Sequence, residues 1–332
     1  MRVIKFFVGV CILILLIDFS FAIEKKGQAG FKFLDIAVGG RPAGMAGAFT
    51  MIEGNVYSLF YNPGGISWTN NKIDLLLNKT KWIAGISYNA FGVIVNFGNW
   101  GTLGCSMLLA EYPKSIRTMV ANNEQGYIEL GEMSANAYSF GLAYSRKLLT
   151  SFSVGGRISY VGQELGQNLV PIISYGEIVG EETVKNKVQT LSYDVGTVFY
   201  PGFKSFRFGV SITNFSEQVK YEQDEFQLPL TFRLAGAMDL MDLVNIRNKE
   251  ALHWLLDVEF LHHRDYSQRI LVGSELSFND TFFIRFGYKH NHDIEKLSFG
   301  IGIKLKVLSV DYSYSPVKYF GQVSRMSLRF SY

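Results

Sequence analysis

The last residues of the chain alternate between apolar and polar side chains. Successive side chains of a β-strand point to opposite faces, so a two-residue period predicts a strand with one apolar and one polar face. In an exported protein, a closing strand of this kind with an aromatic carboxyl terminus is typical of a β-barrel that faces lipid outside and carries its own assembly signal. The apolar residues of this candidate assembly signal are Met326, Leu328, Phe330 and Tyr332.

The same period recurs through most of the chain from about residue 72 onward. In one segment, for example, Phe299 and Ile301 fall on one face, and Gly300 and Gly302 fall on the other. Most segments reach the roughly 9–11 residues that a tilted strand needs to cross a bilayer. We therefore predict an all-β fold, a transmembrane antiparallel outer-membrane β-barrel of about 14 strands, an even number that leaves no unpaired edge in lipid. The predicted strands lie near 72–80, 82–97, 101–112, 135–148, 152–164, 188–200, 204–215, 228–239, 251–263, 268–278, 281–290, 295–305, 306–315 and 322–332.

The predicted connections alternate between short and long. Counted back from the carboxyl terminus, the links expected in the periplasm are tight turns, and the outer links at about 113–134, 165–187 and 216–227 are long. Outer-membrane barrels show this asymmetry, whereas a secreted β-sandwich or propeller, the competing interpretation, would expose polar faces. The link 240–250 is an exception, because it should be periplasmic yet is long. A short helix there, or an error in the strand count, would explain it.

The first 22 residues have the pattern of a secretory signal peptide. Arg2 and Lys5 precede an apolar run from Phe6 to Ile17, and the segment ends in small residues at Ala22. The apolar run is shorter than the roughly 20 residues of a membrane helix. We therefore expect export and cleavage after residue 22.

Composition excludes several kinds of chemistry. The mature chain keeps Cys105 alone, so an internal disulfide and a thiol-ligated zinc site are excluded. The formal net charge is +3, or +2 without the two cations and one anion of the signal peptide, and gives no reason to expect nucleic acid as a partner. His262 and His263 point to opposite faces of a strand, and two histidines make a weak metal site. Without a recognisable catalytic serine motif either, we predict no enzyme, no metal and no cofactor.

Residues 23–71 lack the alternation and are rich in glycine. The run from Gly27 to Thr50, followed by the sequence Leu59-Phe-Tyr-Asn-Pro-Gly-Gly-Ile66, resembles the amino-terminal signature of the PorV/PorQ family of outer-membrane proteins, a branch of the FadL-like long-chain fatty acid transporter barrels. In those barrels an Asn-Pro element ends a hatch that plugs the lumen. The resemblance implies a signal peptide at 1–22, an amino-terminal hatch or plug at 23–71 and a transmembrane barrel at 72–332.

The hatch interpretation agrees with the local residue types. Glycines allow tight backbone and close approach to a barrel wall, the Arg41-Pro42 pair fixes a turn, and the phenylalanines offer apolar packing. A compact cap without a moving part is the alternative. The candidate hatch residues are Gly30, Phe31, Phe33, Gly39, Gly40, Arg41, Pro42, Gly44, Met45, Gly47, Phe49, Asn62, Pro63 and Gly64.

Charged side chains fall on the predicted inner face of the barrel. Isolated charges in a narrow, partly dry lumen are costly, so these groups should be paired. We hypothesise that several form a network that also holds Arg41 of the plug. The members of this candidate network are Arg157, Asp194, Arg207, Arg233, Asp257, Glu259, Glu275, Arg285, Asp311 and Arg329.

Two functions follow from the resemblance. The first is a non-enzymatic scaffold or shuttle in type IX protein secretion, which binds the carboxy-terminal signal domains of cargo proteins at the cell surface. The alternative is a FadL-like, hatch-gated transporter of hydrophobic small molecules such as long-chain fatty acids. The inferred inner face carries mainly glycine, serine and charged residues, which favours the scaffold, because an uptake path for hydrophobic molecules should be apolar.

The long outer loops contain apolar residues that favour binding of a protein partner, although the same residues could fold inward as a lid. The expected location is the outer membrane of a Gram-negative-type bacterium. The expected partners are outer-membrane lipid, the barrel assembly machinery, and secreted cargo or other secretion components, or alternatively a hydrophobic small molecule. The candidate partner-binding residues are Ile116, Tyr127, Ile172, Tyr175 and Ile178.

Overall fold

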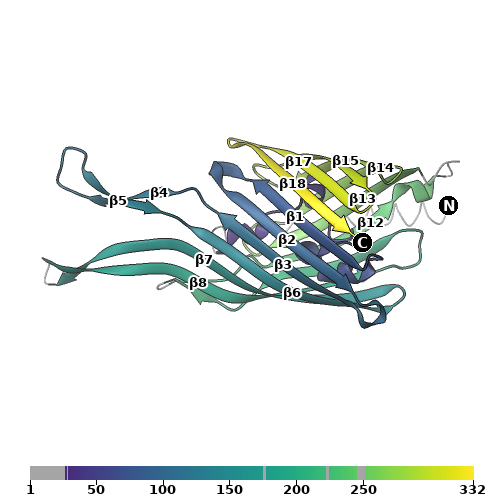
Figure 1. The fold of residues 1–332 in the computed structure, drawn as a ribbon, viewed down its shortest axis with the longest axis horizontal. Coiled ribbons are helices and arrows are strands. Elements are labelled where there is room, and N and C mark those ends of the chain that lie inside the picture. Colours follow the sequence, from purple (N-terminus) through teal and green to yellow (C-terminus); the bar gives the residue numbers. More distant parts are fainter. Residues whose placement is uncertain (1–26, 28, 175–176, 222–223, 245–250) are drawn as a thin grey trace.

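The computed structural model describes residues 27 and 29–332, apart from 175–176, 222–223 and 245–250. In this part of the chain, fourteen strands form one closed antiparallel barrel (Figure 1). The barrel closes because β1 pairs with β2 on one side and with β18 on the other. The predicted fold class is confirmed, and the predicted signal peptide at 1–22 lies outside the described residues. The wall strands are β1 (Ile73–Lys81), β2 (Ser87–Asn96), β3 (Thr102–Glu111), β6 (Asn136–Leu149), β7 (Phe152–Ser174), β8 (Glu177–Phe199), β9 (Arg207–Phe215), β12 (Thr231–Asp239), β13 (Leu252–His263), β14 (Arg269–Phe278), β15 (Phe282–His290), β16 (Leu297–Leu305), β17 (Leu308–Val317) and β18 (Gly321–Ser331).

The wall strands bury every second side chain. β1 alternates between exposed and buried positions along its whole length. In β15, Ile284 and Phe286 are exposed on the outer face, whereas Arg285 is buried on the inner face. This is the period of a pleated strand, and it gives the barrel an apolar exterior and a polar interior.

Two hairpins project from one end of the barrel. Strands β4 (Ser115–Val120) and β5 (Tyr127–Met133) pair with each other, and β7 pairs with β8. These hairpins extend to the left in Figure 1, and the carboxyl terminus lies towards the opposite end. β7 and β8 each have 23 residues, more than twice the roughly 9–11 that cross a bilayer. We call β4–β5 and the outer halves of β7 and β8 the projecting hairpins.

The link 113–134 is long, as expected, and contains the β4–β5 hairpin, whereas the expected link 165–187 is largely taken up by the outer halves of β7 and β8. Most of both ranges is regular strand. A ribbon that stands in water has no apolar face to bury, so the pattern that identified the wall strands is weak there. Two very short strands, β10 (Val219–Lys220) and β11 (Glu225–Phe226), also pair within the link between β9 and β12.

Short 3-10 helices lie in three links: η3 (Ile83–Gly85), η4 (Gly98–Trp100) and η5 (Leu240–Leu243). The last lies in the long link that was the exception to the short-turn pattern, and residues 245–250 of that link lie outside the described residues. None of the helices in the described ranges has both the length and the apolar character to cross a membrane.

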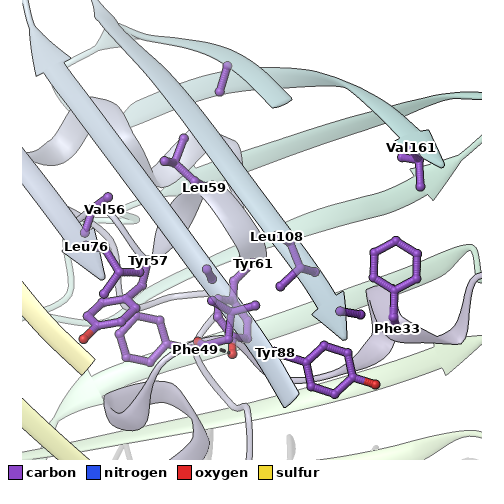
Figure 2. Close-up of a cluster of buried hydrophobic side chains, with 14 of the residues drawn as sticks. Phe33, Phe49, Val56, Tyr57, Leu59, Tyr61, Leu76, Tyr88, Leu108 and Val161 are labelled. Atoms are coloured by element: carbon purple, nitrogen blue, oxygen red, sulfur yellow. Dashed lines mark hydrogen bonds between the residues drawn. The ribbon is translucent and has the colours of Figure 1, made fainter. Parts of the chain in front are cut away.

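Residues 29–71, which we call the plug, lie inside the barrel. They form η1 (Lys32–Asp35), α2 (Gly40–Gly44), α3 (Ser58–Tyr61) and η2 (Pro63–Trp68). α2 contacts β16, β17 and β18, and η2 contacts β6, β7 and β8. The main apolar core lies between the plug and the inner wall (Figure 2), where the ring of Phe49 is centred 5.7 Å from that of Tyr57 and 5.6 Å from that of Tyr61.

Candidate functional site

Carboxylates of the wall accept hydrogen bonds from the plug backbone. The amides of Phe49 and Thr50 both donate to Oε1 of Glu259, each at 2.5 Å. The amide of Met51 donates to Oδ2 of Asp257 at 3.3 Å. An irregular segment inside a barrel has no neighbouring strand, and a buried amide without a partner is costly. The wall side chains therefore replace the backbone partners that a regular element would supply.

A chain of charged groups crosses between plug and wall. Arg41 of the plug binds Glu275 with Nη2 to Oε1 at 2.6 Å. Arg285 binds the same carboxylate at 2.5 Å and Asp311 at 2.8 Å. The hydroxyl of Tyr57, again in the plug, donates to Asp311 at 3.1 Å. The plug is thus joined to one continuous set of wall charges at two points.

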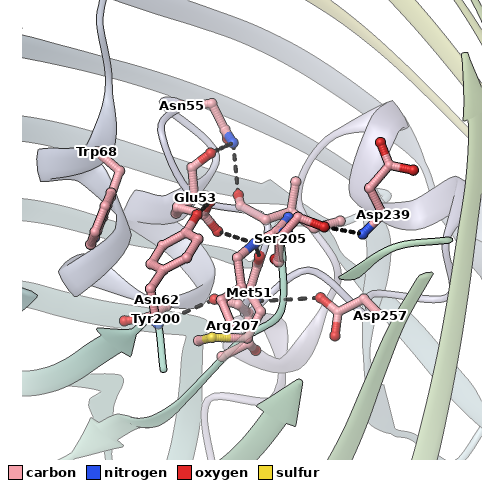
Figure 3. Close-up of polar contacts among 12 residues, drawn as sticks. Met51, Glu53, Asn55, Asn62, Trp68, Tyr200, Ser205, Arg207, Asp239 and Asp257 are labelled. Carbon is pink, nitrogen blue, oxygen red and sulfur yellow. Dashed lines mark hydrogen bonds and ion pairs between the residues drawn. The ribbon is translucent and has the colours of Figure 1, made fainter. Parts of the chain in front are cut away.

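A second set of contacts lies where the plug meets Arg207 (Figure 3). Nε of Arg207 donates to Glu53 Oε2 at 2.8 Å and to the carbonyl oxygen of Met51 at 2.8 Å. The hydroxyl of Tyr200 donates to the same glutamate. The sequence analysis did not identify Glu53. The plug lacks alternating apolar and polar residues, so the sequence does not show which of its side chains face the wall.

The other candidate network residues form separate pairs. Arg157 binds Asp194 at 2.5 Å within the wall, and Arg233 binds Glu259 at 3.1 Å. Arg329 binds Asp74 at 2.7 Å. Asp74 also accepts a hydrogen bond from the plug amide of Val56 at 3.1 Å. The candidate residues are therefore all turned inward, but as several local groups and not as a single network.

The Asn62-Pro63 element meets the wall at an irregular seam. β8 and β9 are fully described here, yet they pair at four positions and with a register shift. At this seam Nδ2 of Asn62 donates to the carbonyl of Thr197 at 3.0 Å and to that of Thr50 in the plug at 3.1 Å. A Cβ on Gly196 would lie 1.9 Å from Asn62 Oδ1, so this wall position has room only for glycine. The Asn62 side chain thus forms a hydrogen bond to β8 where pairing between β8 and β9 is irregular.

The remaining candidate hatch residues are packed tightly. Gly30 and Arg41 are half-buried, and the other members of the set are buried. Gly44 lies against the backbone of β16, because a Cβ on it would come within 2.9 Å of Gly300 Cα. Gly39 has a φ of 97°, which favours glycine. Small residues therefore allow the backbone of the plug to pack directly against the backbone of the wall.

The candidate partner-binding residues lie on the projecting hairpins where they are described. Ile116, Tyr127 and Ile172 are exposed. Tyr175 and the side chain of Ile178 lie outside the described residues. The candidate assembly-signal residues Met326, Leu328, Phe330 and Tyr332 are all exposed at the outer face of the last strand and the terminal residue beyond it. Across the described ranges, no group of three or more histidine, cysteine or acidic side chains is placed to hold a metal ion.

Comparison with known proteins identifies a family and a fold. Residues 94–319 match the family described as type IX secretion system membrane protein PorP/SprF. The comparison with curated proteins finds no match. Among solved structures, the barrel is similar to the CymD monoaromatic hydrocarbon channel, with a TM-score of 0.58, 10% identity, and coverage of 89% of this chain and 98% of that chain.

Two further structures support the same fold. A FadL homologue from Pseudomonas aeruginosa has a TM-score of 0.57 and 11% identity, and it covers 89% of this chain and 98% of its own. The toluene transporter TodX from Pseudomonas putida has a TM-score of 0.53 and 10% identity. The match covers 93% of this chain and 98% of the TodX chain. At such low identity these likenesses establish a FadL-like outer-membrane barrel and no more.

Proposed function

Because this chain belongs to the PorP/SprF family of type IX secretion system membrane proteins, we propose that it is a plugged outer-membrane scaffold that binds secreted proteins at the cell surface. It is a Gram-negative outer-membrane β-barrel. The proposed finer role is to receive the carboxy-terminal signal domain of a cargo protein on the projecting hairpins. The resemblance to PorV/PorQ at residues 28–66 supports this role, although the matched family is PorP/SprF and its match begins after the plug.

The observation that carries the proposal is the contrast between the filled lumen and the projecting hairpins. Ion pairs and hydrogen bonds join the plug to the wall at several levels. Apolar side chains that a barrel would face to lipid occur instead on hairpins that stand beyond the other strands, where Ile116, Met119, Tyr127 and Ile172 are exposed. Exposed apolar groups of this kind are typical of protein interaction sites.

Site-specific photo-crosslinking in cells tests the proposal. A photoreactive residue replaces Ile172 on the β7–β8 hairpin, and a matched control replaces Leu142 on the lipid-facing side of β6, which is 70% exposed. We expect adducts with secreted proteins from position 172 and lipid adducts from position 142. Recovery of lipid alone, or of no adduct, from position 172 and also from positions 116 and 127 would contradict the scaffold.

Transport of a hydrophobic small molecule is the second candidate function. The likeness to hydrocarbon channels supports it at the level of fold, and a cavity with apolar side chains lies at the outer end of the lumen. For this function the plug would have to move. Uptake of a hydrophobic substrate that requires this protein, and that a disulfide locking the plug to the wall abolishes, would favour transport over the scaffold.

A further inference from the structure

The outer half of β8 has a strand partner on one side only (Figure 1). On that side it pairs with β7 as far out as Glu177. On the other side β9 pairs with β8 no further out than Tyr193, which lies opposite Phe215. The short strands β10 and β11 form a separate sheet. Residues 181–191 of β8 therefore have a side to which no described strand is hydrogen-bonded, and we call this side the β8 edge.

The register shows which backbone groups point to the β8 edge. Thr197 directs its carbonyl to the β9 side, where Asn62 of the plug donates to it at 3.0 Å. Successive residues of an antiparallel strand direct their N–H and C=O groups alternately to the two neighbouring strands. The extra residues at the register shifts lie in β7 and β9, so this alternation along β8 is unbroken from 181 to 197. The residues whose N–H and C=O groups point to the β8 edge therefore include Thr183, Lys185, Lys187 and Gln189.

The opposite edge of the same hairpin, formed by β7, is less open to pairing. Gln167 directs its carbonyl away from β8, where Arg117 of β4 donates to it at 3.3 Å. The alternation turns Leu169 and Pro171 the same way, and proline has no N–H to offer. Proline on an edge strand is a common protection against unwanted pairing. In the described part of the hairpin, the β8 edge thus keeps donors and acceptors that the β7 edge lacks.

The charges on the β8 edge indicate which kind of strand it accepts. Lys187 already pairs with Glu164 of β7 at 2.6 Å. Lys185 is exposed, lies opposite Gln167 of β7, and forms no ion pair within the described ranges. Opposite charges across two strands stabilise their pairing, and like charges destabilise it. The β8 edge therefore favours a strand that places an acidic residue opposite Lys185.

A second copy of this chain fits the β8 edge less well. Two barrels in one membrane have the same orientation, so their β8 strands would run the same way and could pair only in parallel. Parallel pairing is slightly less stable than antiparallel pairing, and it would bring the lysines of the two edges together. A secreted polypeptide has neither constraint.

We propose that the β8 edge binds an extended, acidic segment of a secreted protein by strand addition. The segment lies antiparallel to β8, in the position that a longer β9 would occupy. The backbone groups of β8 supply the affinity, and Lys185 supplies the preference for an acidic segment. This inference rests on the proposed scaffold function and deepens it, because it names how the hairpin holds its partner.

Prolines at two directly opposite positions of the hairpin test strand addition. Thr183 and Leu169 are paired in the register, and each directs its N–H away from the other strand. Neither Thr183→Pro nor Leu169→Pro therefore removes a hydrogen bond between β7 and β8, but each blocks one edge. A photoreactive residue replaces the exposed Glu182 in cells. We expect adducts with secreted proteins to fall about tenfold in Thr183→Pro, and to stay unchanged in Leu169→Pro and in Thr183→Val, which keeps the N–H.

Lys185→Glu is a second variant, which keeps every backbone group of the hairpin. The adduct yield should fall about two- to fivefold, whereas Lys185→Arg should retain it. Adducts that persist in both Thr183→Pro and Lys185→Glu would overturn strand addition and leave the scaffold function standing. Equal losses in the two proline variants, or adducts with a second copy of this chain alone, would also overturn it. Absence of adducts from position 182 and from positions 116, 127 and 172 would contradict both proposals.

Discussion

The plug and the β7–β8 hairpin satisfy their backbone hydrogen bonds in different ways. β7 and β8 pair with each other along almost their whole length. The plug consists of short helices and turns, and wall side chains such as Glu259 and Asp257 accept hydrogen bonds from its amides. The plug therefore depends on a few wall residues for its backbone hydrogen bonds, whereas the hairpin forms these bonds within its own backbone. Single substitutions should therefore affect the two regions very differently.

The largest effect is expected from Glu259→Ala. The substitution leaves the amides of Phe49 and Thr50 without acceptors and leaves Arg233 without its ion-pair partner. Breaking a buried pair of this kind costs about 3–5 kcal/mol. Hydrogen exchange measured by mass spectrometry should therefore become faster across residues 45–56, while the wall strand β15 stays protected. Unchanged protection of the plug would show that Glu259 does not hold it.

A smaller effect is expected from Arg41→Ala. Glu275 loses one of its two arginine partners but keeps Arg285 at 2.5 Å, so its charge remains compensated. Exchange of the amides around α2 should become faster, but by less than in the Glu259 variant. Lys114→Ala is a matched control, since Lys114 pairs with Glu132 on the exposed hairpin. An Arg41 variant that exchanges like this control would remove the support for Arg41 as an anchor.

Substitutions on the projecting hairpins should leave the plug unchanged. Ile116→Ser replaces an exposed side chain, and surface changes are usually within about 0.5 kcal/mol. Plug exchange should match that of the wild type, while crosslinking to secreted proteins should fall, because Ile116 is one of the proposed partner-binding residues. Faster plug exchange in this variant would mean that the two regions are coupled, and the comparison would fail.

A further expected effect concerns pH. Burial raises the pKa of Asp35 from its ordinary value of 3.8 to about 6, against the opposing attraction of Lys32. Asp265 and Arg233 also act on this carboxyl, and His263 Nδ1 lies 3.7 Å from it. Because the folded carboxyl binds its proton more tightly than the unfolded one, the folded segment loses stability as pH rises from about 4 to 6. Exchange of residues 32–38, corrected for its intrinsic pH dependence, should be slower at pH 5 than at pH 7, and Asp35→Asn should reduce this difference.

The wall of the barrel could be predicted from sequence because every wall strand has an apolar exterior. The alternation of side chains along each strand was enough to predict that Glu275 and Arg285 face the lumen, where they form an ion pair. The partners contributed by the plug were less accessible to prediction. Arg41 was proposed from the family resemblance, but Glu53 was missed because an irregular segment carries no period. The strands of the projecting hairpins could not be predicted, since strands with water on both sides need no alternation.

The family resemblance and the family match cover different parts of the chain. The resemblance to PorV/PorQ was strongest at residues 28–66, whereas the PorP/SprF match covers 94–319. Type IX secretion and a FadL-like barrel are common to both. The plug sequence therefore indicated the kind of barrel, and the wall sequence identified the family.

The most direct test of a plug held by wall carboxylates is hydrogen exchange of the wild-type protein in nanodiscs, compared between residues 45–62 and residues 115–133. The account predicts that the plug amides exchange as slowly as those of β15, and much more slowly than those of the β4–β5 hairpin. Plug amides that exchange as rapidly as the hairpin would contradict it.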